Sequence, residues 1–87
     1  MTIIKIGASW CLSCHSMDKK LKQIKDKYNI DIKELDYDFD DEEVDKYNIG
    51  EKLPVLIFMK DDKEVCRLNG EKNVSDIEEV LNKYEEV

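Results

Sequence analysis

The sequence predicts an α/β domain whose elements follow the order β-α-β-α-β-β-α, giving a four-stranded mixed sheet flanked by three helices. Three observations lead to this prediction. A short apolar run at residues 2–7 leads into a stretch where apolar side chains recur at steps of 3 and 4, which is typical of one helix face. A second apolar run follows Pro54, and another helical pattern closes the chain. Because 87 residues suit one modest core, we predict a single domain over residues 1–87.

The first strand and the first helix meet at a pair of cysteines. The strand is predicted over residues 2–7, where isoleucines surround Lys5 and the run ends at Gly7. The helix is predicted over about 11–28, with the charged side chains of its other face, Asp18 among them, in solvent. Its apolar stripe consists of Cys14, Met17, Leu21, Ile24 and Tyr28.

The middle of the chain is acidic. Residues 31–38 alternate weakly and predict a second strand, parallel to the first because a helical crossover joins them. A calcium loop counted from Asp36 would need Gly at its sixth position and Glu at its twelfth, where the chain has Asp41 and Tyr47. We therefore expect Asp40 or Asp41 to cap a short helix over about 41–48.

The last third of the chain predicts a hairpin and a helix. Strands are expected over 54–59, opened by Pro54, and over 63–68, with a helix over 73–86 that is capped either by a Ser75–Glu78 capping box or by Asn73. The expected sheet order is 31–38, 2–7, 54–59, 63–68, with the last two strands antiparallel to the first two. Helices one and three should cover one face and the short helix the other.

The composition of the chain excludes several classes of function. The net charge of −7 argues against a nucleic-acid or anionic-membrane surface, and no apolar run approaches the roughly 20 residues of a membrane span. Three cysteines are too few for a disulfide scaffold. No leader pattern follows Met1, so we expect a cytosolic, reducing location if this is the whole natural chain. There a close cysteine pair is more often catalytic or metal-binding than structural.

Cys11 and Cys14 form that pair, at the turn from the strand into the helix. The attacking species in thiol chemistry is the thiolate, and a helix start stabilises an anion. Cys11, at or just before the first turn, should therefore attack a disulfide. Cys14, one turn further on the apolar stripe, should be more buried and should resolve the mixed disulfide.

These residues resemble the thioredoxin family over nearly the whole chain. The shared motifs are Ser9-Trp10-Cys11-x-x-Cys14 after a short strand, Lys52-Leu53-Pro54-Val55, and Gly70 before the last helical pattern. The family usually carries a further strand and helix ahead of this point, so the resemblance implies the thioredoxin fold in a minimal, glutaredoxin-sized form.

The resemblance also implies an activity, which is that of an enzyme reducing protein disulfides without a bound cofactor or metal. A flavin-dependent thioredoxin reductase would re-reduce it. Trp10 would flank the active site. A cis Leu53–Pro54 bond would lie against the cysteines, keep metal ions away and leave the backbone of Leu53 free to pair with a substrate peptide. A monomer is expected.

Lys5 is the main departure from the family pattern, which has a buried Asp six residues before the first cysteine. A Lys partner is frequent on the next strand, where this chain has Glu34. We hypothesise a Lys5–Glu34 pair beneath Cys14, with Glu34 or a water molecule relaying its proton, because a buried charge needs a partner. The alternative is that Lys5 reaches solvent and Glu34 is a surface residue. Leu12-Ser13 replaces the usual Gly-Pro, which should change the redox poise.

Other functions remain open at this point. A glutaredoxin-like enzyme re-reduced by glutathione fits the size, although Trp10 and the absence of Cys-Pro-Tyr-Cys speak against it. Cys11-Leu12-Ser13-Cys14-His15 also has the spacing of covalent haem attachment, with His15 as axial ligand. A structural zinc site would need His15 and Cys66 to converge on the pair. Otherwise we expect His15 to be a surface residue and Cys66 a small apolar residue on a strand.

Overall fold

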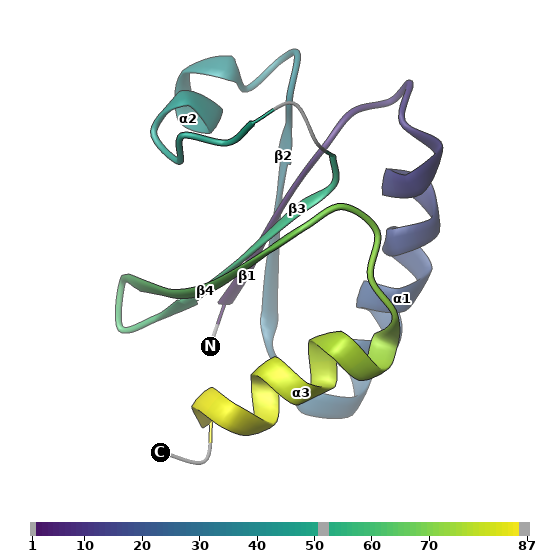
Figure 1. Ribbon diagram of the computed structural model, residues 1–87, viewed down its shortest axis with the longest axis vertical. Coiled ribbons are helices and arrows are strands. Elements are labelled where there is room, and N and C mark those ends of the chain that lie inside the picture. Colours follow the sequence, from purple (N-terminus) through teal and green to yellow (C-terminus); the bar gives the residue numbers. More distant parts are fainter. Residues whose placement is uncertain (1, 51–52, 86–87) are drawn as a thin grey trace.

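The computed structural model describes residues 2–50 and 53–85, and it confirms the predicted fold class (Figure 1). A four-stranded sheet carries helices on both faces. The elements in chain order are β1 (Thr2–Gly7), α1 (Leu12–Tyr28), β2 (Asp31–Asp36), α2 (Asp41–Asp45), β3 (Val55–Lys60), β4 (Lys63–Asn69) and α3 (Val74–Glu85). Residue 86, expected at the end of the last helix, and Lys52 of the Lys-Leu-Pro-Val motif lie outside the described residues.

The sheet has the predicted order, β2-β1-β3-β4, with β1 parallel to β2. The expectation that the last two strands both oppose the first two is wrong. Strand β3 is antiparallel to β1, and β4 is antiparallel to β3, so β4 runs in the same direction as β1. The reason is the tight turn at Asp61 and Asp62, whose positive φ values of 54° and 64° reverse the chain as a two-residue hairpin requires.

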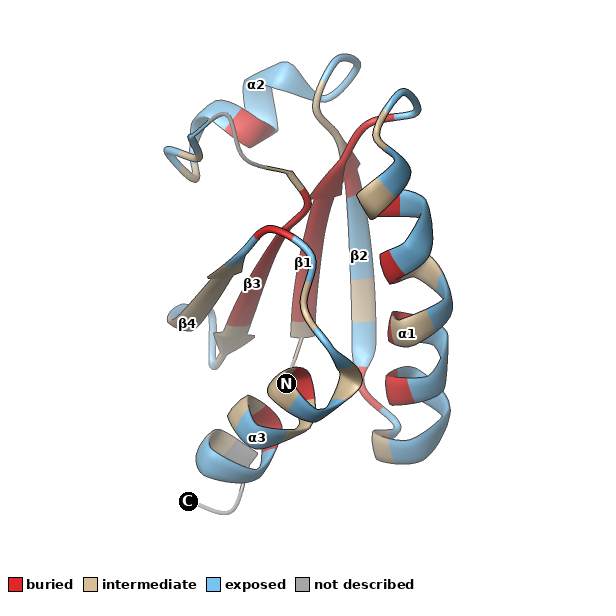
Figure 2. Cartoon of the chain, turned by 45° about the vertical axis from the view of Figure 1, so that its right-hand side comes forward, coloured by how far each residue is buried: buried red, intermediate tan, exposed pale blue. Residues whose placement is uncertain are grey.

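Alternation along β1 divides the core into two layers. Ile3 packs with α1 and α3 on one face of the sheet, while Ile4 and Ile6 pack with Val44 of α2 on the other. Figure 2 shows the buried residues of β1 and β3 between these helices. The same alternation points Lys5 and Gly7 towards α1. The expected placement of the helices on the two faces is therefore confirmed.

The helix ends differ from the prediction in two details. Helix α2 ends at Asp45 rather than near residue 48, because the next backbone groups form tighter turn bonds and Asn48 has a φ of 51°. For α3, the Asp76 side chain accepts a hydrogen bond from the Asn73 N–H at 3.1 Å. Of the two expected caps, Asn73 directly precedes the first helical residue, Val74. The alternative, the Ser75–Glu78 capping box, is wrong, because Glu78 accepts hydrogen bonds from Lys27 and Tyr28 of α1 instead.

Within the ranges 2–50 and 53–85, no helix combines the length and the apolar character needed to cross a bilayer.

Candidate active site

Cys11 is the N-cap of α1, at the end of the turn that follows β1. Its backbone N–H donates to the Ala8 carbonyl at 3.1 Å, which closes that turn. Its Sγ accepts a hydrogen bond from the Cys14 N–H at 3.2 Å, in the manner of a capping oxygen. The Cys11 sulfur thus lies beside an otherwise unpaired N–H, at the positive end of the helix dipole.

Cys14 lies one turn further into the helix and is 2% exposed. Burial is the main reason why the pKa of its thiol rises from the usual 9.0 to about 11, and the hydrogen bond with Cys11 adds to this. A backbone hydrogen bond from Ala8 and the positive charge of Lys5 act in the opposite direction. Both cysteines are in the free thiol form in this structure.

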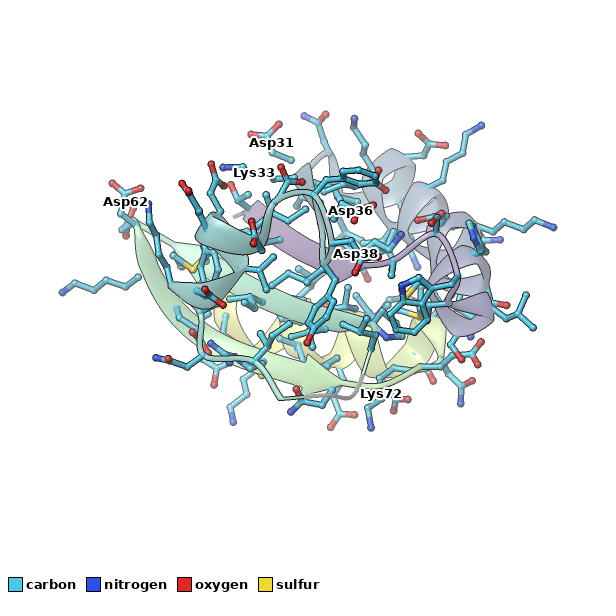
Figure 3. All side chains as sticks on the ribbon, turned by 90° about the horizontal axis from the view of Figure 1, so that it is seen from above. Asp31, Lys33, Asp36, Asp38, Asp62 and Lys72 are labelled. Carbon is cyan, nitrogen blue, oxygen red and sulfur yellow. The ribbon has the colours of Figure 1, made fainter. Side chains whose placement is uncertain are left out.

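Trp10 directly precedes Cys11 in the chain, and 64% of its surface is exposed. Its indole N–H donates to Asp38 Oδ2 at 2.8 Å. Asp38 is held in place by Asp36, whose Oδ1 accepts the backbone N–H groups of Asp38 and Phe39 at 2.8 and 3.1 Å. In Figure 3, Asp36 and Asp38 lie between α2 and the start of α1. The sequence prediction counted Asp38 within the second strand and missed this contact.

Two more large apolar side chains are exposed near this end of the molecule. Leu12 follows Cys11 at the start of α1, and Phe39 follows Asp38 in the loop that holds Trp10. Both are more than four-fifths exposed. We call Trp10, Leu12 and Phe39 the apolar rim.

The Leu53–Pro54 peptide bond is cis. Pro54 is buried, and its carbonyl accepts the N–H of Gly70, which has a φ of 82°, at 2.8 Å. Because Val55 pairs with Ile6 across the sheet, Pro54 lies at the end of β1 from which the cysteine turn departs. Leu53 is half-buried and packs on the α2 side of the core.

Lys5 is the one charged residue that is buried in the described part of the chain, with 7% exposure. Its ammonium forms a hydrogen-bonded ion pair with Asp18 Oδ1. The pair expected with Glu34 is present at 3.8 Å, in a register where Lys5 lies directly opposite Glu34. Asp18 is therefore the closer partner, and the expectation that it lies on a purely solvated helix face is wrong. The signal in the sequence was its position four residues after Cys14, which places both on the same side of the helix.

A cavity of about 390 Å³ joins Lys5 to Cys14. Besides Cys14, its titratable lining consists of Lys5, His15, Asp18, Glu34, Asp36 and Asp40. Gly7 also lines it, and a Cβ at Gly7 would lie 3.0 Å from Cys14 Sγ and 3.4 Å from Lys5 Cε. The lysine stem and the buried sulfur therefore border one small space that glycine leaves open.

The two remaining candidates differ in their relation to the pair, because His15 borders the cavity and Cys66 lies on β4. His15 is exposed, and its Nε2–H donates to the Ser9 carbonyl at 2.9 Å. Cys66 is half-buried on β4, opposite Phe58, and packs against the core layer under α1 and α3. Over residues 2–50 and 53–85, no three His, Cys, Asp or Glu side chains come together as a metal site.

Comparisons with known proteins agree with this geometry. A family model described as Thioredoxin matches residues 1–83. Thioredoxin H8 of Arabidopsis thaliana is 32% identical over 85 residues, which is 97% of this chain but 56% of that protein. The chain thus spans little more than half the length of this curated relative.

Solved structures are similar over most of the chain. A mutant thioredoxin from Halobacterium salinarum NRC-1 superposes with a TM-score of 0.92 at 16% identity, covering 99% of this chain and 75% of that one. Fasciola hepatica thioredoxin gives a TM-score of 0.86 at 25% identity, covering 95% of this chain and 79% of that one.

Proposed function

Because the chain belongs to the thioredoxin family, we propose that it is a thiol-disulfide oxidoreductase that reduces protein disulfides through Cys11 and Cys14. The observation that carries this proposal is the unequal setting of the two sulfurs. Cys11 Sγ accepts an N–H at the helix start and is partly accessible, whereas Cys14 is buried and its pKa is raised to about 11. One sulfur is suited to attack and the other to wait as a thiol.

The first step forms a mixed disulfide. The Cys11 thiolate attacks one sulfur of the substrate disulfide, a bond forms between Cys11 and that sulfur, and the other substrate sulfur leaves as a thiolate that takes up a proton. In the second step Cys14 loses its proton and attacks Cys11 Sγ. The Cys11–Cys14 bond forms, the bond to the substrate breaks, and the substrate leaves as a dithiol, reduced by two electrons.

The apolar rim and the cis Leu53–Pro54 bond are proposed to receive the substrate. All three side chains of the apolar rim are exposed. Trp10 and Leu12 are the sequence neighbours of Cys11, and Phe39 lies in the loop whose Asp38 accepts a hydrogen bond from Trp10. Exposed aromatic side chains of this kind are frequent anchors in protein recognition. The backbone of Leu53, at the end of the sheet where the cysteine turn begins, would pair with an extended substrate segment.

An external reductant must return the protein to the dithiol form. We propose a flavin-dependent thioredoxin reductase in a reducing, cytosolic setting, with the protein acting as a monomer. Glutathione is the second candidate, because the chain has the size of a glutaredoxin. Lys5 and Glu34 are proposed as support for Cys14, and no metal or cofactor takes part in this scheme.

The test is the reduction of insulin disulfides with either NADPH and thioredoxin reductase or glutathione as the electron source. Wild-type protein is expected to turn over with the reductase and much more slowly with glutathione. Cys11→Ser should lose turnover entirely, Cys14→Ser should accumulate a mixed disulfide, and Cys66→Ser is the control that should retain wild-type turnover. Full activity in Cys11→Ser would overturn the proposal, and faster turnover with glutathione would replace the reductase by glutathione.

A further inference from the structure

Lys5 is a buried lysine that borders the same cavity as Cys14, the thiol proposed to resolve the mixed disulfide. Lys5 lies in the middle of β1, where its neighbours Ile4 and Ile6 are core residues. A charge in such a place is strongly disfavoured unless partners offset its desolvation. An apolar side chain would fill the position at less cost, so the ammonium needs an explanation.

Two carboxylates from different elements hold the Lys5 ammonium. Asp18 reaches it from α1 and Glu34 from β2. Asp18 follows Cys14 by one helical turn, so the contact fixes the lysine on the side of α1 that carries the buried sulfur. Glu34 is exposed and more distant, at 3.8 Å, and it draws the ammonium less strongly.

The cavity then determines what the ammonium can act upon. Cys14 faces this space together with four carboxylates, those of Asp18, Glu34, Asp36 and Asp40. His15 borders it as well, with its Nε2–H bonded to Ser9, and Cys11 lies at the helix start. Lys5 supplies the ammonium among these groups. Without it, a thiolate at Cys14 would face negative charge from both β2 and α1.

We propose that Lys5 is a positioning residue for the resolving step, in which its ammonium, held by Asp18, stabilises the thiolate that Cys14 must become. This inference rests on the proposed function, because it concerns the second of the two steps. The proton of Cys14 passes to solvent through the cavity. The Cys14 electron pair then forms the bond to Cys11 Sγ, and the electrons of the broken Cys11–substrate bond leave on the substrate sulfur, which is protonated.

The experiment separates the two steps by using dithiobis(nitrobenzoate) as the disulfide, in a Cys66→Ser background. Attack by Cys11 releases one coloured thiolate, and attack by Cys14 on the resulting mixed disulfide releases the second. Both phases are followed by stopped flow over a range of pH. The first phase reports the attacking step, and the second reports how readily Cys14 ionises.

Lys5→Met is expected to slow the second phase by about three- to tenfold at neutral pH and to move its pH midpoint upward. Lys5→Arg, which keeps the charge, should restore most of the rate. Lys33→Met is the matched control, because Lys33 pairs with Glu43 on the other face of the sheet and its loss changes the net charge equally.

The outcomes distinguish this inference from the function on which it rests. A missing second phase in the wild-type protein would overturn the two-step function. A normal second phase whose pH midpoint is the same in Lys5→Met and wild type, or shifts equally in Lys33→Met, would overturn only the role of Lys5. If Lys5→Met does not fold by circular dichroism, Lys5→Gln, which also removes the charge but keeps a polar end, decides, and a midpoint equal to that of the wild type contradicts the proposal.

Discussion

Cys11 and Cys14 are chemically identical, and their places at the start of one helix make them differ. Cys11 sits where backbone N–H groups have no helical partner, and its sulfur accepts one of them. Cys14 sits on the face of α1 that turns to the sheet, and burial holds its proton. The asymmetry needs no special residue, since a strand, a tight turn and a helix start produce it.

Phe39 gives a prediction at this scale. The substitution Phe39→Ser removes an exposed aromatic ring from the apolar rim without touching the core. If the rim receives protein substrates, KM for insulin should rise by about three- to tenfold while kcat stays close to wild type. The reaction with dithiobis(nitrobenzoate), which is too small to need the rim, is the internal control. An unchanged KM for insulin would remove Phe39 from the docking surface.

Sequence reasoning reached some residues of the site and missed others for a physical reason. Cys11 and Cys14 belong to a short motif whose local chain path fixes their place, and Pro54 was reached through the resemblance to a known family, because its place depends on the pairing of β3 with β1. Asp18 and Asp38 act through contacts with Lys5 and Trp10, which lie 13 and 28 residues away. For Asp18 the sequence holds only its position one turn after Cys14, and nothing in the residues around Asp38 shows that the fold brings Trp10 to it.

Strand β1 organises the site at the scale of the elements. Its odd positions face α1 and its even positions face α2, so one alternation builds a core layer on each side and directs Lys5 towards Cys14. The strand ends at Gly7, beneath the first turn of α1. Here a missing side chain, rather than a present one, sets how closely the helix can approach.

Gly7→Ala tests that close approach. The new methyl group would lie 3.0 Å from Cys14 Sγ, so α1 or the sulfur must shift, and we expect a loss of about 1–3 kcal/mol in the free energy of unfolding. The second phase of the dithiobis(nitrobenzoate) reaction should change as well. Gly50→Ala is the control, because nothing lies within 4 Å of a Cβ there, and its stability should stay near wild type. Equal stability of the two variants in urea unfolding would contradict the packing described here.

The periodicity of the sequence predicted the helices and strands themselves, but it did not predict all of their ends, caps and directions. The spacing of apolar residues in α1 and the apolar run of β3 are local signals, and the predicted bounds of both elements agree with the structure to within about one residue. The predicted hairpin already implied the direction of β4, because the two strands of a hairpin are antiparallel. The end of α2 depends on the backbone angle of Asn48. The cap of α3 depends on tertiary contacts, because Glu78, which a capping box would direct to the Ser75 N–H, bonds instead to Lys27 and Tyr28 of α1.

The whole molecule is a small two-layered core whose stability is coupled to the state of one thiol. Cys14 is buried beside the sheet, so its ionisation and the folding of the chain are linked. With a folded-state pKa near 11 and an unfolded value of 9.0, the neutral thiol is the form that the fold prefers.

The sign of the pH dependence follows from that shift. The stability that the neutral Cys14 thiol contributes is fully present below the unfolded pKa of 9.0 and is lost as the pH rises towards 11. We expect reduced wild-type protein to lose about 1–3 kcal/mol relative to Cys14→Ala across this window, as measured by urea unfolding in steps from about pH 8 to about pH 11. Comparison with Cys14→Ala removes the titration of other groups. A constant difference between the two proteins would mean that Cys14 ionises as it does in an unfolded chain.

The most direct test of the central claim is to mix the reduced protein with one equivalent of a disulfide-linked peptide and analyse the quenched products by peptide mass spectrometry. The account predicts that a bond between Cys11 and Cys14 appears in step with the free thiols of the peptide, while Cys66 remains a thiol. A peptide that stays oxidised, or a reduced peptide accompanied by a protein bond that involves Cys66, would contradict it.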